Sequence, residues 1–210
     1  MKHLISVASF AVGTMGVAVL LVSLDAYPRE PWRAGADSSP PGRSFLMAAT
    51  GRVEIAFSPN EGAEALVLRV IRSAAHAGGQ LRMLAYSFTS GTITHELLLA
   101  KKAGADIKLV VDARECAERD RMGKAARNLA QLVAAGVDVR TLDTYLDAHD
   151  KTIVADERTV QTGSYNDSDA SARANSENVV VLWDNADAAQ VFLTHFYRNY
   201  AQAVPLRPPQ

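Results

Sequence analysis

The sequence has a single cysteine, Cys116, in 210 residues, so no disulfide can form within the chain. This excludes the small disulfide-stabilised scaffolds, whatever compartment the protein occupies. An excess of one charge is also lacking, because 22 lysines and arginines face 23 aspartates and glutamates. A broadly basic nucleic-acid coat is therefore excluded, although a local phosphate-binding site is not. With 48% hydrophobic and 21% charged residues, the composition is that of a globular protein.

Metal-binding motifs are lacking as well. The sequence contains neither the histidine–glutamate patterns of zinc hydrolases nor a cluster of cysteines and histidines. The acidic segment Asp167-Ser168-Asp169 has no accompanying ligand pattern. We therefore expect no metal and no cofactor.

The N-terminal residues differ in character from the rest. Lys2 and His3 precede an uncharged run over residues 4–24, which ends at Asp25. The run exceeds the hydrophobic region of a typical signal peptide and approaches the length of a membrane span. Residues 1–26 fit either an uncleaved signal anchor or an inefficiently cleaved signal peptide. Both alternatives predict an extracytoplasmic (periplasmic or secreted) protein, and the first anchors it to the inner membrane through residues 4–24.

Residues 27–50 are rich in proline, glycine and serine, which is typical of a linker. From residue 51 the pattern becomes regular. Predicted helices at about 62–77, 92–103 and 121–135 each end at a glycine and lead into a predicted strand. Glycine fits the left-handed position after a helix at no steric cost. This alternation predicts an α/β domain over residues 51–203 with a largely buried sheet.

The last third of the domain is richer in strands. Strands are predicted at 149–155, 158–162 and 178–183, with a hairpin turn at Asp156-Glu157 between the first two. A final helix is predicted at about 186–201. The tail, residues 204–210, holds three prolines and is expected to be loose.

The residues that carry chemistry lie in this last third. The segment from His149 to Asp156 fits the pattern H-x-K-x-x-x-x-D. Side chains alternate along a strand, so His149 and Lys151 share a face, as do Ser164 and Asn166 at the end of the next strand. An imidazole, an ammonium, a hydroxyl and an amide that converge suit a phosphodiester. The imidazole is the candidate nucleophile, and the other groups stabilise charge on the phosphoryl oxygens.

Two carboxylates accompany this set. Asp156 has the opposite parity to His149, and we expect it to support the turn or pair with a cation. Glu177 leads into a later strand and is a candidate to accept a hydrogen bond from His149, which would fix the imidazole tautomer. The bare H-x-K-x-x-x-x-D pattern arises by chance in roughly 1 chain in 100. Taken alone, it leaves open that His149 and Lys151 are two solvated residues; the downstream motifs argue against this.

Together, the stretches AHDKTIVADERTVQTGSYN and NSENVVVLWD resemble the phospholipase D superfamily, above all its small single-motif branch of bacterial endonucleases. The resemblance covers about residues 51–203 and includes the segments FSPN, LAYSFTS and IKLVVD. It implies one α/β sandwich domain with a mixed sheet flanked by helices. It also implies metal-independent phosphodiester hydrolysis through a phosphohistidine, in a site that combines two H-x-K motifs.

The resemblance assigns roles by position. His149 takes the nucleophile or the acid role, and Lys151 binds phosphate. The downstream polar pair, the histidine-orienting carboxylate and the motif aspartate correspond to Ser164 with Asn166, Glu177 and Asp156. The sequence departs from the family pattern at two positions. Asp150 stands where the family often has asparagine or another residue, and Asp167 stands where an aromatic is common.

One H-x-K motif is present where the mechanism needs two. We therefore expect a homodimer in which two His149 side chains meet across a two-fold axis. The other candidate histidines, His76, His95 and His195, are predicted to be surface or packing residues. Three functions remain open: a non-specific endonuclease on DNA or RNA, a phospholipase D that hydrolyses membrane phospholipids, and a non-catalytic phosphate-binding module.

Overall fold

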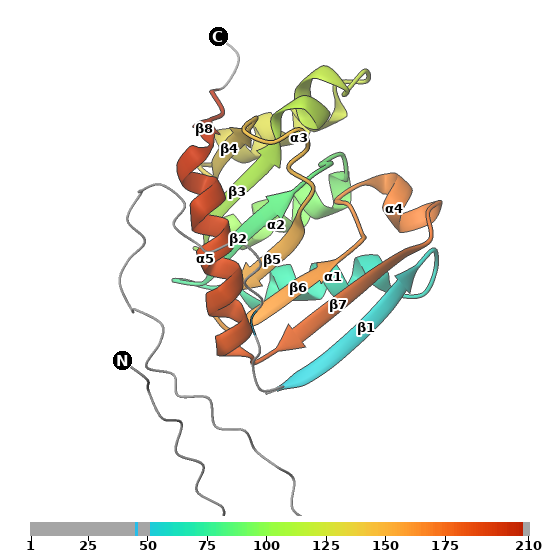
Figure 1. Ribbon diagram of the computed structural model, residues 1–210, viewed down its shortest axis with the longest axis vertical. Helices are drawn as coiled ribbons and strands as arrows, with labels where there is room; N and C mark the ends of the chain where they lie inside the picture. The colour runs from blue at the N-terminus through green and yellow to red at the C-terminus, as the bar shows by residue number, and fades with distance from the viewer. Residues whose placement is uncertain (1–44, 46–50, 208–210) are drawn as a thin grey trace, which may run out of the picture. The chain divides into compact units, whose positions relative to one another are not determined.

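The computed structural model describes Phe45 and residues 51–207 (Figure 1). The predicted signal segment (1–26) lies outside the described residues, as does the predicted linker (27–50) apart from Phe45. Within the described part, no helix combines the length and the apolar character that crossing a bilayer requires.

The domain is built on one mixed sheet of eight strands, and Figure 1 shows their arrangement. The parallel strands β2, β3 and β4 form one part of the sheet, and every other neighbouring pair is antiparallel. In spatial order the strands are β1 (Arg52–Ser58), β7 (Glu177–Trp183), β6 (Thr159–Gly163), β5 (Lys151–Ala155), β2 (Gln80–Ala85), β3 (Asp106–Asp112), β4 (Asp138–Leu142) and β8 (Val204–Pro205).

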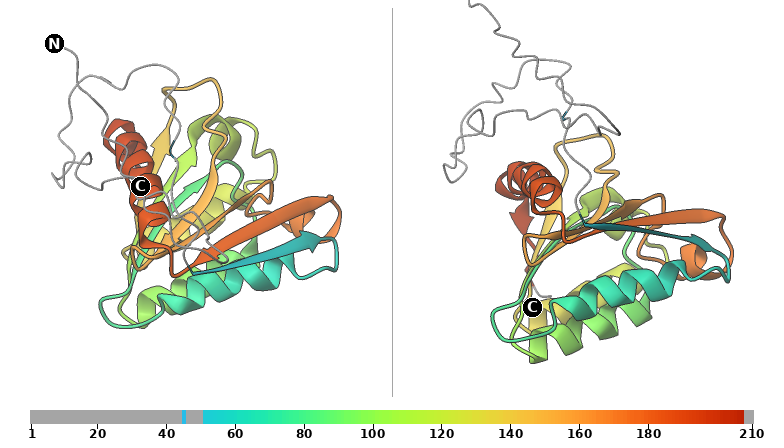
Figure 2. Two further views of the ribbon diagram at one scale, coloured as in Figure 1. Left: turned by 60° about the horizontal axis from the view of Figure 1, so that its bottom comes forward. Right: turned by 90° about the horizontal axis from the view of Figure 1, so that it is seen from below.

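Helices cover both faces of the sheet, as Figure 2 shows. One face carries α1 (Ala63–Ser73), α2 (Gly91–Lys102) and α3 (Lys124–Ala134), and the opposite face carries α5 (Ala186–Gln202). The largest apolar cluster lies under α1, α2 and α3, and two smaller clusters lie under α5. This arrangement confirms the predicted α/β sandwich with a mixed sheet flanked by helices.

The predicted alternation of helix, glycine and strand is present. Gly104 after α2 and Gly136 after α3 have φ values of 101° and 81°, which side chains with a Cβ rarely adopt. The hairpin turn between β5 and β6 also lies where it was predicted, and Asp156 and Glu157 both have positive φ. The predicted strand at 149–155 begins two residues late, because β5 starts at Lys151. His149 and Asp150 therefore precede the strand ladder.

Three short elements were not predicted. They are the helix α4 (Asp169–Arg173), a π-helical turn (Arg114–Glu118) and the strand β8. Strand β8 corrects the prediction of a loose tail for residues 204–206. Val204 and Pro205 pair with β4, and the backbone N–H of Leu206 donates to the carbonyl of Val139 (2.9 Å).

Strand β1 lies at one edge of the sheet and has an unusual outer face. Ala56 packs towards the main apolar cluster, whereas Val53, Ile55 and Phe57 point the other way and are exposed. Helix α5 packs on β2, β4, β5 and β6 and leaves these three side chains uncovered in the described part.

Candidate active site

The sheet topology brings the predicted site residues other than Asp156 to the same end of the central strands. Strand β5 runs antiparallel to β2, so its first residue, Lys151, lies opposite Ala85 at the end of β2. Strand β6 ends at Gly163 opposite Val179, near the start of β7. The C-terminal ends of β2 and β6 therefore lie beside the N-terminal ends of β5 and β7. The residues that flank these four strand ends meet there.

His149 and Lys151 are in direct contact. Nζ of Lys151 lies 3.2 Å from Nδ1 of His149 and donates to the His149 carbonyl oxygen at 3.0 Å. The ring of Tyr86 lies against both: its centroid is 4.4 Å from that of His149 and 5.0 Å from the Lys151 nitrogen. Lys151 is only 7% exposed, whereas His149 is open to solvent. The expected juxtaposition of imidazole and ammonium is therefore present.

The contact with Lys151 selects a tautomer of His149. An ammonium group can only donate hydrogen bonds, so Nδ1 accepts and the proton of a neutral ring lies on Nε2. Acting as an acid from Nε2 requires a further proton on Nδ1, since a neutral imidazole that lost its only proton would become an imidazolate. Attack by Nε2 instead requires the proton to move to Nδ1 and Lys151 to turn away from the ring.

Burial lowers the pKa of the Lys151 ammonium below its ordinary value. The negative charges of Asp150, Glu177 and Asp167 oppose this effect and favour the charged form. The three carboxylates thus partly offset the effect of burial and favour the cation that a phosphate would need.

Glu177 does not bind His149 in this structure, which corrects that expectation. Its Oε2 accepts a 2.6 Å hydrogen bond from the Ser164 hydroxyl, and its Oε1 accepts one of 3.0 Å from the Asn175 amide. The physical reason is proximity, since Ser164 follows β6 and Glu177 begins the neighbouring β7. Ser164 also accepts from the backbone and side-chain amides of Asn178 (3.0 and 3.2 Å).

The other two predicted residues take different positions. Asn166 lies beyond β6, where its backbone N–H donates to the Ser171 hydroxyl (3.2 Å), and its buried Oδ1 has no hydrogen-bond partner among the described residues. Asp156 lies at the opposite end of β5, about 17 Å along the strand from Lys151. There its carboxylate accepts from the backbone N–H of Gln80 (2.8 Å) and contacts Nε2 of His76 (3.0 Å). Asp156 therefore lies apart from His149 in this structure and binds the residues around the β5–β6 turn.

Sequence reasoning did not assign two residues of the site, Tyr86 and Asp167. Tyr86 lies in the LAYSFTS segment, and its hydroxyl accepts from Arg119 (2.8 Å), which also binds Asp147 (3.0 Å). Asp167 lies in an acidic segment and departs from the family pattern, but neither feature predicts a role for it in the site. Its side chain is buried, and burial raises the pKa of its carboxyl to about 7, although the charge of Lys151 acts against this.

Other chemistries find less support in the described residues. Cys116 is buried, and burial raises the pKa of its thiol to about 12, so it is a poor nucleophile at neutral pH. Within residues 51–207, no three His, Cys, Asp or Glu side chains gather as a metal site would require. The arrangement best suited to chemistry is the exposed imidazole of His149 beside the buried ammonium of Lys151. The hydroxyl–carboxylate pair of Ser164 and Glu177 lies at the same end of the strands.

Comparison with known families identifies this arrangement. A family model described as "Cardiolipin synthase, PLD-like domain" matches residues 68–200, which include the H-x-K segment and β5, β6 and β7. The chain belongs to the phospholipase D superfamily. Its enzymes act on phosphodiester bonds, and the chain is accordingly a phosphodiester hydrolase of this superfamily.

Individual members of the superfamily are similar over most of the domain. Nuc from Salmonella typhimurium, solved as a phospholipase D family member, is 36% identical, with a TM-score of 0.69 over 74% of this chain and 98% of that one. A phospholipase D of Rickettsia typhi is 28% identical over 153 residues, 72% of this chain and 70% of the relative. The mitochondrial cardiolipin hydrolase of Homo sapiens is 26% identical over 69% of this chain and 54% of its own length.

Proposed function

We propose that this phosphodiesterase is a non-specific endonuclease that cleaves DNA or RNA without a metal ion, through a phosphohistidine on His149. The observation that carries the proposal is the exposed imidazole held between the Lys151 ammonium and the Tyr86 ring. It presents a nitrogen to solvent, and the neighbouring cation can neutralise phosphoryl oxygens.

The proposed reaction has two steps. Nε2 of one His149 attacks phosphorus, an N–P bond forms, and the P–O bond to the leaving alcohol breaks while a second His149, protonated on both ring nitrogens, gives its Nε2 proton to the leaving oxygen and becomes neutral. Water then attacks phosphorus, the N–P bond breaks, and the proton of the water passes to the second histidine. Lys151 and Asn166 stabilise the charge on the non-bridging oxygens. The hydrogen-bonded pair Ser164 and Glu177 lies at the same end of the strands.

The second histidine comes from a second copy of the chain. The acid must be an imidazolium, whereas the attacking histidine must be neutral with a lone pair on Nε2, so one ring cannot fill both roles at the same time. The loop before β5 supports a partner at this position. Leu146, three residues from His149, is 79% exposed, and Tyr145 beside it is exposed as well. A two-fold partner would cover these apolar side chains as it completes the site.

Nucleic acid is favoured as substrate by the sequence resemblance to the single-motif endonuclease branch. The domain has the compact size expected of that branch, since it covers 98% of Nuc, a phospholipase D family member. Hydrolysis of membrane phospholipids is the second candidate, because relatives bear the names phospholipase D and cardiolipin hydrolase. The uncharged run over residues 4–24 supports action outside the cytoplasm, with that run as a membrane anchor in the phospholipid case.

The substrate test uses the purified full chain in EDTA, incubated separately with supercoiled plasmid, single-stranded RNA, cardiolipin vesicles and phosphatidylcholine vesicles. We expect nicking of plasmid and cleavage of RNA, both weakened steeply by salt because counterions are released on binding. Lipid hydrolysis with intact nucleic acid would overturn the choice of substrate. Loss of all activity in EDTA, restored by Mg²⁺ or Zn²⁺, would overturn the mechanism.

The stoichiometry test uses mixed dimers. Wild-type and His149→Ala chains with different tags are co-expressed at several ratios, and all dimers are purified together. If each site needs two histidines, activity falls with the square of the wild-type fraction. A linear fall would show that one copy is sufficient. Quenching at alkaline pH and searching for phosphate on His149 tests the intermediate directly.

A further inference from the structure

Asp150 lies between the two reactive residues of the H-x-K motif but faces away from them. Its Oδ2 lies 2.9 Å from Nε2 of His195, a residue of helix α5. The two residues are 45 positions apart in the chain. The pair therefore links the segment that carries His149 to α5, the helix on the sheet face opposite α1, α2 and α3.

The neighbours of His195 determine its tautomer. Nη2 of Arg198 lies 2.6 Å from Nδ1, and a guanidinium can only donate, so Nδ1 accepts. The ring proton therefore lies on Nε2 and is donated to Asp150, and Nδ2 of Asn199, which lies 3.1 Å from the same Nε2, does not donate to it in this form. Burial raises the pKa of Asp150, but the hydrogen bond and electrostatic attraction of His195 and the charges of Lys151 and Arg198 outweigh it and leave the pKa below its ordinary value. The contact is thus an N–H donor on an ionised carboxylate.

This contact fixes a segment that the sheet does not hold. His149 precedes β5 and has no partner in the strand ladder. On its N-terminal side the backbone N–H of Ala148 donates to Oδ2 of Asp112 (2.7 Å). On its C-terminal side Asp150 is bound by His195. The backbone of His149 is therefore held at both neighbouring residues, once from β3 and once from α5.

We propose that His195 is a positioning residue, which acts through Asp150 to hold the imidazole of His149 and the ammonium of Lys151 in their reactive arrangement. The proposal rests on the proposed role of His149. Small displacements of a catalytic group have large kinetic effects, since a shift of 1 Å can cost on the order of a hundredfold in rate.

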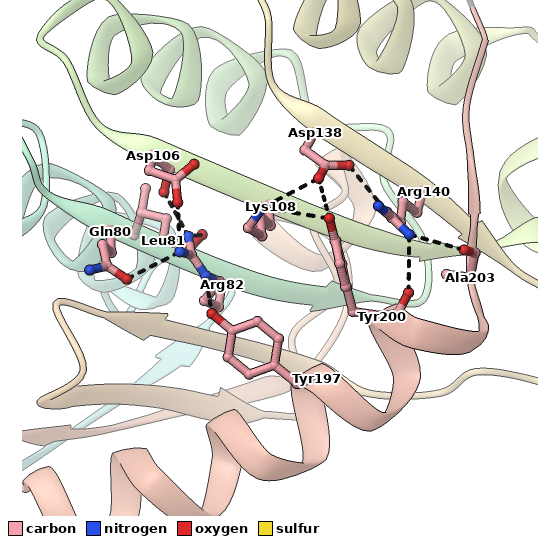
Figure 3. A network of polar contacts seen from close by, with 10 residues as sticks. All are labelled: Gln80, Leu81, Arg82, Asp106, Lys108, Asp138, Arg140, Tyr197, Tyr200 and Ala203. Carbon is pink, nitrogen blue, oxygen red and sulfur yellow. Dashed lines mark hydrogen bonds and ion pairs between the residues drawn. The ribbon is translucent and has the colours of Figure 1, made fainter. Parts of the chain in front are cut away.

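Helix α5 is attached to the sheet by other contacts as well, as Figure 3 shows. The Tyr197 hydroxyl accepts from Nε of Arg82 (3.0 Å), and Tyr200 binds Asp138 and lies under the guanidinium of Arg140 (3.8 Å to the ring centroid). Phe196 is buried in the apolar cluster below the helix. We therefore expect α5 to stay in place when the His195 ring is removed. Besides Asp150, the ring contacts Arg198 and Asn199, which belong to the same helix.

The test compares His195→Leu, which removes the donor, with His195→Gln, which retains a side-chain N–H, in the full chain. Tyr197→Phe is the matched control, because it removes a hydrogen bond from the same helix away from the site. Bis(p-nitrophenyl) phosphate serves as substrate, so the outcome does not depend on the choice between nucleic acid and lipid. We expect His195→Leu to lower kcat about tenfold or more with little change in KM. His195→Gln should recover most of kcat, and Tyr197→Phe should keep it.

Two outcomes overturn the proposal. One is a His195→Leu kcat within about twofold of wild type while His149→Ala is inactive. The other comes from comparing Asp150→Asn, His195→Leu and the double variant. If the two residues act as a pair, the double variant loses no more kcat than the worse single variant; losses that multiply would show that they act independently and would overturn the proposal. Residual activity of His149→Ala equal to wild type would instead refute the proposed function itself. Because Asp150→Asn changes the pair from the other side, the test holds even if His195→Leu fails to fold.

Discussion

The ammonium nitrogen of Lys151 lies 3.2 Å from Nδ1 of His149 and 3.0 Å from the carbonyl oxygen of the same residue. One buried cation therefore orients the imidazole and is also the nearest positive charge for a phosphate. Because one nitrogen performs both functions, removing the charge of Lys151 should abolish the orientation of the imidazole and the stabilisation of the phosphate together.

Lys151→Met keeps the length of the side chain and removes its charge. We expect kcat/KM to fall about 10²–10³-fold, because a group that stabilises developing charge in a water-poor site typically contributes that much. Lys124→Met is the control, since Lys124 makes only a half-exposed ion pair with Asp169 (3.4 Å). Steady-state kinetics on a phosphodiester measures both variants. A Lys151→Met enzyme with a tenth or more of wild-type activity would contradict the assignment.

Tyr86 should contribute through its ring rather than its hydroxyl. The ring contacts His149 and lies under Lys151, whereas the hydroxyl only accepts from Arg119. We expect Tyr86→Phe to retain most activity and Tyr86→Leu to lose about tenfold, in keeping with the energy of a partly buried cation–π contact. Equal losses in the two variants would instead assign the effect to the hydroxyl.

Asp167 should make stability fall with rising pH. Unfolded, this carboxyl ionises near 3.9, whereas burial raises the folded pKa to about 7. Between these values the folded state binds the extra proton, so the free energy of unfolding decreases as pH rises and levels off above pH 7. Asp167→Asn cannot ionise. We expect it to match wild type at pH 4 and to exceed it by up to about 4 kcal/mol at pH 8.

Urea unfolding at pH 4, 5.5, 7 and 8 measures this difference. The prediction concerns its pH dependence, which an asparagine that merely packed better or worse would not produce. A constant difference across the four pH values would show that Asp167 keeps an ordinary pKa in the folded state.

Asp156 should matter for stability and not for chemistry. It binds the backbone of Gln80 and the ring of His76 at the end of β5 remote from His149. We expect Asp156→Ala to lower the free energy of unfolding by about 1–2 kcal/mol through the lost backbone contact, and to leave kcat unchanged below the melting transition. A large loss of kcat in a fully folded variant would return Asp156 to the active site.

Most of the fold could be predicted because its signals are local. The glycines after the helices and the apolar periodicities depend on neighbouring residues, and they located the predicted helices and most strands within a few residues. The elements that were missed depend on distant partners. Helix α4 has five residues, too few for a periodicity, and β8 exists because Val204 and Pro205 reach β4 after α5 ends.

The site divides in the same way. His149 and Lys151 are two residues apart, so strand parity was enough to bring them together. The partner of Glu177 depended on the register between β6 and β7, where Ser164 is nearer than His149. The contact of Asp150 with His195 joins residues on different elements, and no spacing in the sequence indicates it.

The exposed row Val53, Ile55 and Phe57 has a practical consequence. An edge strand with unprotected apolar side chains is a template onto which another extended chain can add. Purified protein at high concentration should then self-associate through β1 as well as through the site, and mass alone would count both kinds of contact. The mass measured by light scattering or sedimentation should therefore also be determined for the Ile55→Lys variant. Its charge on the edge strand hinders strand addition and leaves His149 unchanged.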